Sequence, residues 1–159
     1  MTNTVSGSCH CGALRVRFTS NQRFASLSVR ACQCSFCTKH GARTTTDPSG
    51  QLEIEIGDPA RLLRYRFGMN TADYLLCSGC GVYAAAVLTD GERSWATLNI
   101  NLLDPIADDR FAAATPAEYG AEDQDARIAR RKARWTPTRV RIAPGEPGEP
   151  GEPGERDRG

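Results

Sequence analysis

Residues 7–19 read Gly-Ser-Cys-His-Cys-Gly-Ala-Leu-Arg-Val-Arg-Phe-Thr, which joins two closely spaced cysteines to an alternating run of apolar and polar residues. Leu14, Val16 and Phe18 alternate with polar side chains, as expected of a β-strand with one buried face. Cys9 and Cys11 precede this run, and residues i and i+2 of an extended chain point to the same side. The stretch therefore predicts a strand that begins beside two sulfurs able to bind one metal ion.

Further short apolar or alternating runs follow, separated by turn residues. We expect strands at Ala13–Thr19, Ser26–Cys32, Gln51–Ile56, Leu62–Phe67, Tyr74–Leu76, Val82–Leu88, Ser94–Leu103 and Thr136–Ile142. Short strands with a turn about every 8–12 residues predict a mainly β protein of antiparallel sheets. Glu122–Trp135 has its acidic residues first and its arginines last, which suits a helix dipole, so we expect one short C-terminal helix there.

Composition and charge bound the rest of the organisation. We place one domain at residues 1–143, because residues 144–159 carry a Gly-Glu-Pro repeat without apolar side chains to bury and predict a disordered tail. We see no signal peptide and no long apolar run, so we expect a cytoplasmic protein with no membrane contact. A net charge of +1 provides no nucleic-acid footprint, so we expect no nucleic-acid partner.

The seven cysteines fall into three clusters, and an odd number in a reducing compartment argues against a disulfide framework. Four thiolates close a tetrahedral zinc site, whereas three leave one position open for water or substrate. Two pairs far apart in the chain predict the closed, structural site: Cys9 with Cys11, and Cys77 with Cys80. Gly79 and Gly81 permit the unusual backbone angles that a tight Cys-x-x-Cys turn needs.

The remaining cluster is Cys32, Cys34 and Cys37, and it has no fourth cysteine of its own. His40 follows three residues later. If His40 binds the metal, the site is closed and structural, and if it does not, the fourth position is open and reactive. Two alternatives stay open: Cys77 and Cys80 can join this cluster instead, or the thiols can hold an iron–sulfur cluster, although the usual four-cysteine run is missing.

With their neighbours, the three clusters resemble the glutathione-dependent formaldehyde-activating enzyme family, which includes the centromere protein V-like proteins. The similarity extends from about Ser6 to about Asp104, and Arg127–Pro137 also looks like the C-terminal part of some members. The resemblance is carried by Gly7-Ser8-Cys9-His10-Cys11-Gly12, Cys32-Gln33-Cys34-Ser35-Phe36-Cys37 and Leu76-Cys77-Ser78-Gly79-Cys80-Gly81. The chain departs from the family pattern at Gln33, where many members have His, and at Leu76, where an aromatic residue is frequent.

The resemblance implies a fold, two metal sites and a reaction. The fold is an Mss4-like β-tent of antiparallel sheets with zinc knuckles. The reaction is that of a carbon–sulfur lyase, which joins glutathione and formaldehyde into S-hydroxymethylglutathione, so the implied partners are a small-molecule thiol and an aldehyde. The implied cofactors are two Zn²⁺ ions per chain, a structural ion on Cys9, Cys11, Cys77 and Cys80 and a catalytic ion on Cys32, Cys34 and Cys37.

Two classes of function remain to be distinguished, an enzyme acting on a thiol–aldehyde adduct and a non-catalytic zinc-binding module with a structural or partner-binding role. An open fourth position beside a cleft favours the enzyme, and a side chain in that position favours the module. Other residues are candidates for supporting roles. Lys39, His40 and Arg43 can bind a substrate carboxylate or move a proton, Tyr83 and Trp95 can wall a pocket, and Arg127–Arg134 can contact an acidic partner or form a solvated helix face.

Overall fold

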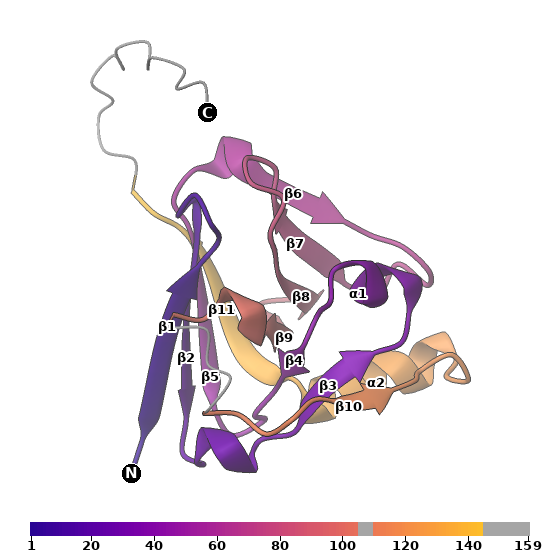
Figure 1. The fold of residues 1–159 in the computed structure, drawn as a ribbon. Helices are drawn as coiled ribbons and strands as arrows, with labels where there is room; N and C mark the ends of the chain where they lie inside the picture. Colours follow the sequence, from indigo (N-terminus) through magenta and orange to yellow (C-terminus); the bar gives the residue numbers. More distant parts are fainter. Residues whose placement is uncertain (105–109, 145–159) are drawn as a thin grey trace, which may run out of the picture.

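The computed structural model describes residues 1–104 and 110–144 of the chain (Figure 1). The helices are α1 (Ser35–Lys39) and α2 (Gln124–Arg134), and three short 3₁₀ turns lie at Phe24–Ser26, Pro59–Arg61 and Ile100–Leu102. The strands are β1 (Asn3–Ser8), β2 (Leu14–Ser20), β3 (Val29–Cys32), β4 (Thr44–Thr45), β5 (Gln51–Ile56), β6 (Leu62–Tyr65), β7 (Asp73–Cys77), β8 (Tyr83–Asp90), β9 (Arg93–Asn99), β10 (Thr115–Ala117) and β11 (Thr136–Ile142). The mainly β fold predicted from the sequence is confirmed.

The eleven described strands form one sheet whose main path runs β1-β2-β5-β11-β9-β4-β3-β10, while β8, β7 and β6 continue from β9. Most neighbours pair antiparallel, as expected. Two pairs are parallel, β11 with β5 and β10 with β3. Parallel neighbours require a long crossover connection, which local sequence patterns do not reveal.

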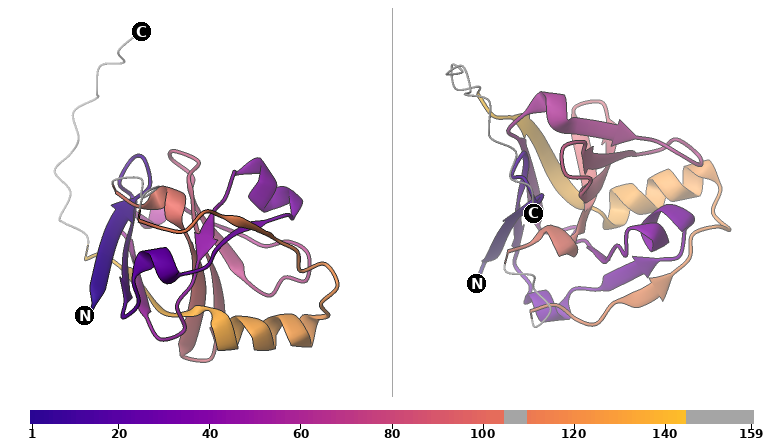
Figure 2. Two further views of the ribbon diagram at one scale, coloured as in Figure 1. Left: turned by 60° about the horizontal axis from the view of Figure 1, so that its bottom comes forward. Right: turned by 45° about the horizontal axis from the view of Figure 1, so that its top comes forward.

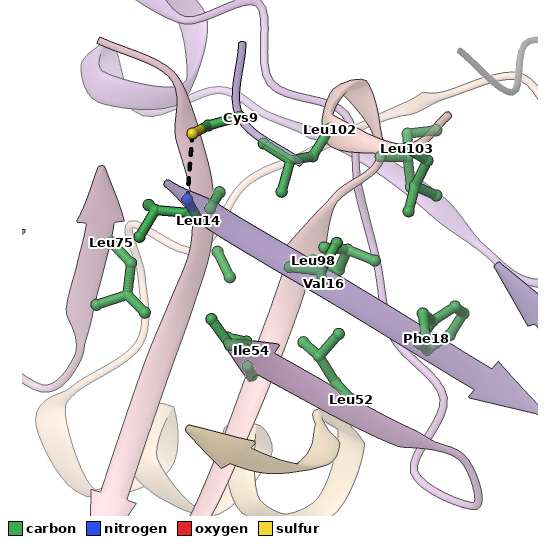
Figure 3. Packing of buried hydrophobic residues seen from close by; sticks show 14 of the residues in the cluster. Cys9, Leu14, Val16, Phe18, Leu52, Ile54, Leu75, Leu98, Leu102 and Leu103 are labelled. Atoms are coloured by element: carbon green, nitrogen blue, oxygen red, sulfur yellow. Dashed lines mark hydrogen bonds between the residues drawn. The ribbon is translucent and has the colours of Figure 1, made fainter. Parts of the chain in front are cut away.

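The hydrophobic core lies against the alternating strands. Leu14, Val16 and Phe18 of β2 are buried, while the residues between them are exposed, as the alternation predicts. Figure 3 shows these side chains packed with residues of β5, β7 and β9, among them Ile54 and Leu98. Burying each large apolar side chain contributes about 1.5–3 kcal/mol, so this face drives the assembly of the sheet.

The sequence did not predict β1, β10 or α1, and each omission has a physical reason. β1 is largely polar and forms because it pairs along its whole length with β2. β10 contains Pro116 and lies at the end of the strand path. α1 is a single short helix formed inside a cysteine cluster.

The expected C-terminal helix is α2. The side chain of Asp123 caps it, because its Oδ1 accepts a hydrogen bond of 2.8 Å from the N–H of Ala126. Two views show α1 and α2 at the end of the molecule that lies away from β1 and β2 (Figure 1; Figure 2). Within the described residues, neither helix has the length and apolar content to cross a membrane. The predicted Gly-Glu-Pro tail, residues 144–159, lies outside the described part of the chain except for Pro144.

Candidate functional site

Four thiols, which we call the outer group, lie within 4.8 Å of one another: Cys9, Cys11, Cys77 and Cys80. The Sγ atoms of Cys9 and Cys11 are 3.8 Å apart, and those of Cys11 and Cys77 are 3.4 Å apart. A tetrahedral zinc ion with Zn–S bonds of about 2.3 Å holds its sulfurs about 3.8 Å apart. The outer group therefore fits a closed four-thiolate metal site.

Two tight turns present these sulfurs. The N–H of Gly12 donates to the carbonyl of Cys9 at 2.9 Å, and the N–H of Gly81 donates to the carbonyl of Cys77 at 2.7 Å. Both glycines have positive φ, 79° and 77°, which other residues rarely adopt. The expectation for Gly81 is confirmed, whereas Gly79 has no positive φ. The N–H of Leu14 also donates to the Sγ of Cys9 at 3.3 Å (Figure 3).

The second set, which we call the inner group, consists of Cys32, Cys34 and Cys37, whose sulfurs also lie within 4.8 Å of one another. Cys32 ends β3, Cys34 is the N-cap of α1, and Cys37 lies buried within that helix. The first turn of α1 folds the chain back, so the N–H of Cys37 donates to the Sγ of Cys34 at 3.4 Å. Cys77 and Cys80 belong to the outer group and do not join this one.

His40 lies outside the inner group. It is the exposed C-cap residue of α1, and its ring packs against Phe36 with the ring centres 4.5 Å apart. Among the described residues, the ligand atoms that gather here are the three sulfurs alone. The inner group is therefore a three-thiol site. Of the two arrangements that the sequence allowed, closed by His40 or open at the fourth position, the structure has the open one.

Hydrogen bonds lower the pKa of Cys11 and Cys80 in the outer group and of Cys32 in the inner group. The N–H of Ala13, followed by the side chains of Cys77 and Arg61, lowers the pKa of Cys11 to about 6. The contact with Cys37 lowers the pKa of Cys32 to about 5, although burial acts in the opposite direction. The same contact, together with burial, raises the pKa of Cys37. Metal ions bind the thiolate, so both groups are prepared for a cation.

A cavity of about 390 Å³, which we call the main cavity, adjoins the inner group. It lies between the end of β3, the β6–β7 connection and helix α2. One side is polar and basic, and the other is aromatic. Its lining includes Cys32, Gln33, Cys34, Phe67, Tyr74, Glu118, Tyr119, Arg127, Arg130 and Arg131.

Arginines of α2 give the main cavity an excess of positive charge. Arg130 binds both carboxylate oxygens of Glu122, at 2.5 and 3.0 Å, and Arg127 lies 3.5 Å from the same carboxylate. Among the described residues, the main cavity is lined by one carboxylate, that of Glu118. Arg131 has no carboxylate of a described residue within 4.0 Å. The wall therefore favours an anionic ligand.

A second hollow of about 50 Å³, which we call the small cavity, lies deeper. Cys32 and Cys37 line it together with Tyr83, Arg131 and Trp135. It shares Cys32 and Arg131 with the main cavity, so the two are neighbours. Another hollow of about 400 Å³ lies over β1, β2 and β5 and contains no cysteine, so we do not connect it with the thiol chemistry.

Some supporting residues differ from those expected. Lys39 and Arg43 line neither cavity, and Arg43 instead donates to the Oδ1 of Asn101 at 2.8 Å. The arginines that line the main cavity come from α2, which the sequence assigned to a solvated face or an acidic partner. Arg127, Arg130 and Arg131 are spaced i, i+3 and i+4, which places them on one helix face. This spacing was the feature of the sequence from which a shared basic face could have been predicted. Tyr83 does wall a pocket.

These features define a class, a mainly β protein with a closed four-thiol site and an open three-thiol site beside a basic cavity. Residues 4–119 match the family described as glutathione-dependent formaldehyde-activating enzyme, and the chain belongs to this family. It is also similar to a Rhodobacter sphaeroides protein solved by crystallography as a structural genomics target. The two sequences are 28% identical, the match covers 70% of this chain and 99% of that one, and the TM-score is 0.56. The resemblance seen in the cysteine runs is confirmed, and α2 lies beyond the residues that match the family.

Proposed function

We propose that the protein is a zinc-dependent enzyme of the carbon–sulfur lyase type, which forms or cleaves the adduct of a small thiol and an aldehyde. Glutathione and formaldehyde, giving S-hydroxymethylglutathione, are the proposed pair. One observation carries the proposal: three thiols converge beside a cavity of about 390 Å³, with no fourth ligand among the described residues. A purely structural zinc site is normally closed by four ligands, as in the outer group.

The thiol chemistry suits a soft, anionic ligand set. Cys32, Cys34 and Cys37 would hold the zinc ion, which would supply a soft cation suited to binding a thiolate. When the sulfur adds to the aldehyde carbon, the carbon–sulfur bond forms and the C=O π pair moves to the oxygen. The oxygen then takes the proton that the thiol released, so the reaction needs no oxidant or reductant.

The chain's own residues position the thiol. Arg127 and Arg130 share Glu122 and lie on the cavity wall, where their remaining N–H groups can bind the carboxylates of a peptide-like thiol. Phe67 and Tyr74 form an aromatic wall that limits the access of water. Holding two small reactants side by side removes much of the entropic cost of their reaction.

The direct test follows adduct formation by NMR after zinc-loaded protein, glutathione and formaldehyde are mixed. We expect a rate above the spontaneous reaction, and we expect Cys34→Ala to abolish the excess rate. His40→Ala is the matched control, because His40 lies outside the inner group, and it should keep wild-type activity. Bound zinc should fall from two ions per chain to one in Cys37→Ser. Two bound zinc ions without any excess rate would instead identify a non-catalytic zinc module.

A further inference from the structure

Three buried hydrogen-bond donors of the described residues lack an acceptor. One of them, the Nε of Arg127, lies 3.5 Å from the carboxylate of Glu122, and the other two face the small cavity. The hydroxyl of Tyr83 and the Nε of Arg131 are both buried, and neither has a hydrogen-bond partner among the described residues. Their residues are only 2% and 6% exposed. Buried donors without partners are rare and cost free energy, so each such group calls for an explanation.

Both residues line the small cavity, together with Cys32 and Cys37. A volume of about 50 Å³ admits a group of a few heavy atoms, since about 10–15 Å³ of such space is enough for one water. It does not admit a peptide-like thiol. The main cavity next to it is the larger space, so the small cavity is suited to a small part of the substrate.

The charges around the small cavity select an anionic acceptor. Arg30, Arg130 and Arg131 line it, and its described lining contains no carboxylate. Arg131 donates from its Nη1 to the Oγ1 of Thr71 at 2.5 Å and lies over the ring of Trp135 at 4.6 Å, which leaves its charge without a counterion in the described chain. Arg30 likewise donates to a hydroxyl, the Oγ1 of Thr46, at 3.0 Å.

We infer that the small cavity binds the aldehyde oxygen of the substrate, and the alkoxide that replaces it, through hydrogen bonds from the Tyr83 hydroxyl and the Arg131 Nε. This inference rests on the proposed function. As the carbon–sulfur bond forms, the C=O electron pair moves to the oxygen between these two donors. The alkoxide then takes the proton that the thiol released. Donors that meet growing negative charge stabilise the transition state more than the ground state, so they raise kcat more than they lower KM.

The kinetic test uses Tyr83→Phe, which keeps the ring and removes only the hydroxyl. We expect kcat to fall about 100-fold, with the KM for the thiol within twofold of wild type and two zinc ions still bound. Tyr65→Phe is the matched control. Tyr65 is exposed and packs against Phe36, as Tyr83 does, but it lines neither cavity, so the variant should keep wild-type kcat. A loss below threefold in Tyr83→Phe would overturn the inference and leave an ordered water as the partner of the two donors.

A binding test separates this inference from the proposed function. Formate, a small oxygen acceptor, is titrated into the zinc-loaded protein and followed by calorimetry. We expect wild type to bind it, Tyr83→Phe to bind about tenfold more weakly, and Arg131→Met to lose binding. If the wild-type protein proves inactive, the proposed function fails, and the formate titration alone tests whether the small cavity binds an oxygen acceptor. Binding that depends on Tyr83 then supports an acceptor site in the small cavity, and absent or unchanged binding overturns it. If wild type is active, the kinetic result decides.

Discussion

Gly7 is a position where one added carbon would disrupt the packing of two chain segments. A Cβ there would lie 2.1 Å from the carbonyl oxygen of Leu102 and 2.6 Å from the Cα of Leu103. Both obstacles are backbone atoms, and the segments are joined by a bridge between Gly7 and Leu103. The N–H of Asp104 also donates to the carbonyl of Ser6 at 3.0 Å, which fixes the approach further.

We therefore expect Gly7→Ala to lower the free energy of unfolding by about 3 kcal/mol, measured by urea denaturation. Gly120→Ala is the control, because nothing lies within 4 Å of a Cβ at that position and its φ is not positive. Its effect should stay within about 0.5 kcal/mol. Equal stability of the two variants would mean that β1 and the segment at Leu102–Leu103 move apart at little cost in free energy.

At the scale of elements, α2 connects the stability of the chain with the cavity beside the inner group. Its cap, Asp123, holds the first turn, and Arg127 lies in that part of the helix. The Nη2 of Arg127 also donates to the carbonyl of Tyr119 at 2.6 Å, so the start of α2 is joined to the loop that closes the main cavity. Loosening this turn should therefore move a charged wall of the cavity.

We expect Asp123→Ala to lower stability by about 1 kcal/mol in thermal unfolding and to raise the KM for a carboxylate-bearing thiol, with zinc content unchanged. Asp123→Asn is the conservative control, because asparagine is an equally good N-cap residue. It should retain both stability and KM. An asparagine variant as impaired as the alanine variant would point to the charge of Asp123 rather than to its cap.

At the scale of the whole molecule, the outer group joins two distant turns. Cys9 and Cys11 belong to the β1–β2 turn, while Cys77 ends β7 and Cys80 lies in the β7–β8 turn. The β7–β8 turn belongs to the branch of strands that extends from β9, away from the β1 end of the strand path. A metal ion at this point would fasten the branch to the main path of the sheet.

Structural zinc contributes about 10 kcal/mol or more to small domains, which is comparable with the whole stability of about 5–15 kcal/mol. We therefore expect chelation of zinc, or Cys80→Ser, to abolish cooperative thermal unfolding monitored by circular dichroism. Cys37→Ser should retain a cooperative transition, because it removes a ligand from the inner group only. An apo-protein with the melting temperature of the zinc-loaded form would show that packing alone maintains the fold.

Elements whose buried residues recur at a regular spacing could be predicted from the sequence. Strands β2 and β5 could be predicted because their apolar residues alternate, and α2 because its charges follow the helix dipole. The spacing of the cysteines indicated three local clusters, since a knuckle is a local turn, whereas packing decided which clusters meet. These features depend on residues that are close in the chain, so a reader of the sequence can find them.

The tertiary structure alone decided what depends on distant contacts. β1 and β10 form because a partner strand is available, and β11 lies parallel to β5 because the chain crosses over. Packing places the arginines of α2 beside the inner group and His40 outside it, and it leaves Tyr83 and Arg131 as buried donors without acceptors. Local patterns determine which face of an element is buried. Which residues then meet across the fold depends on the packing of the whole chain.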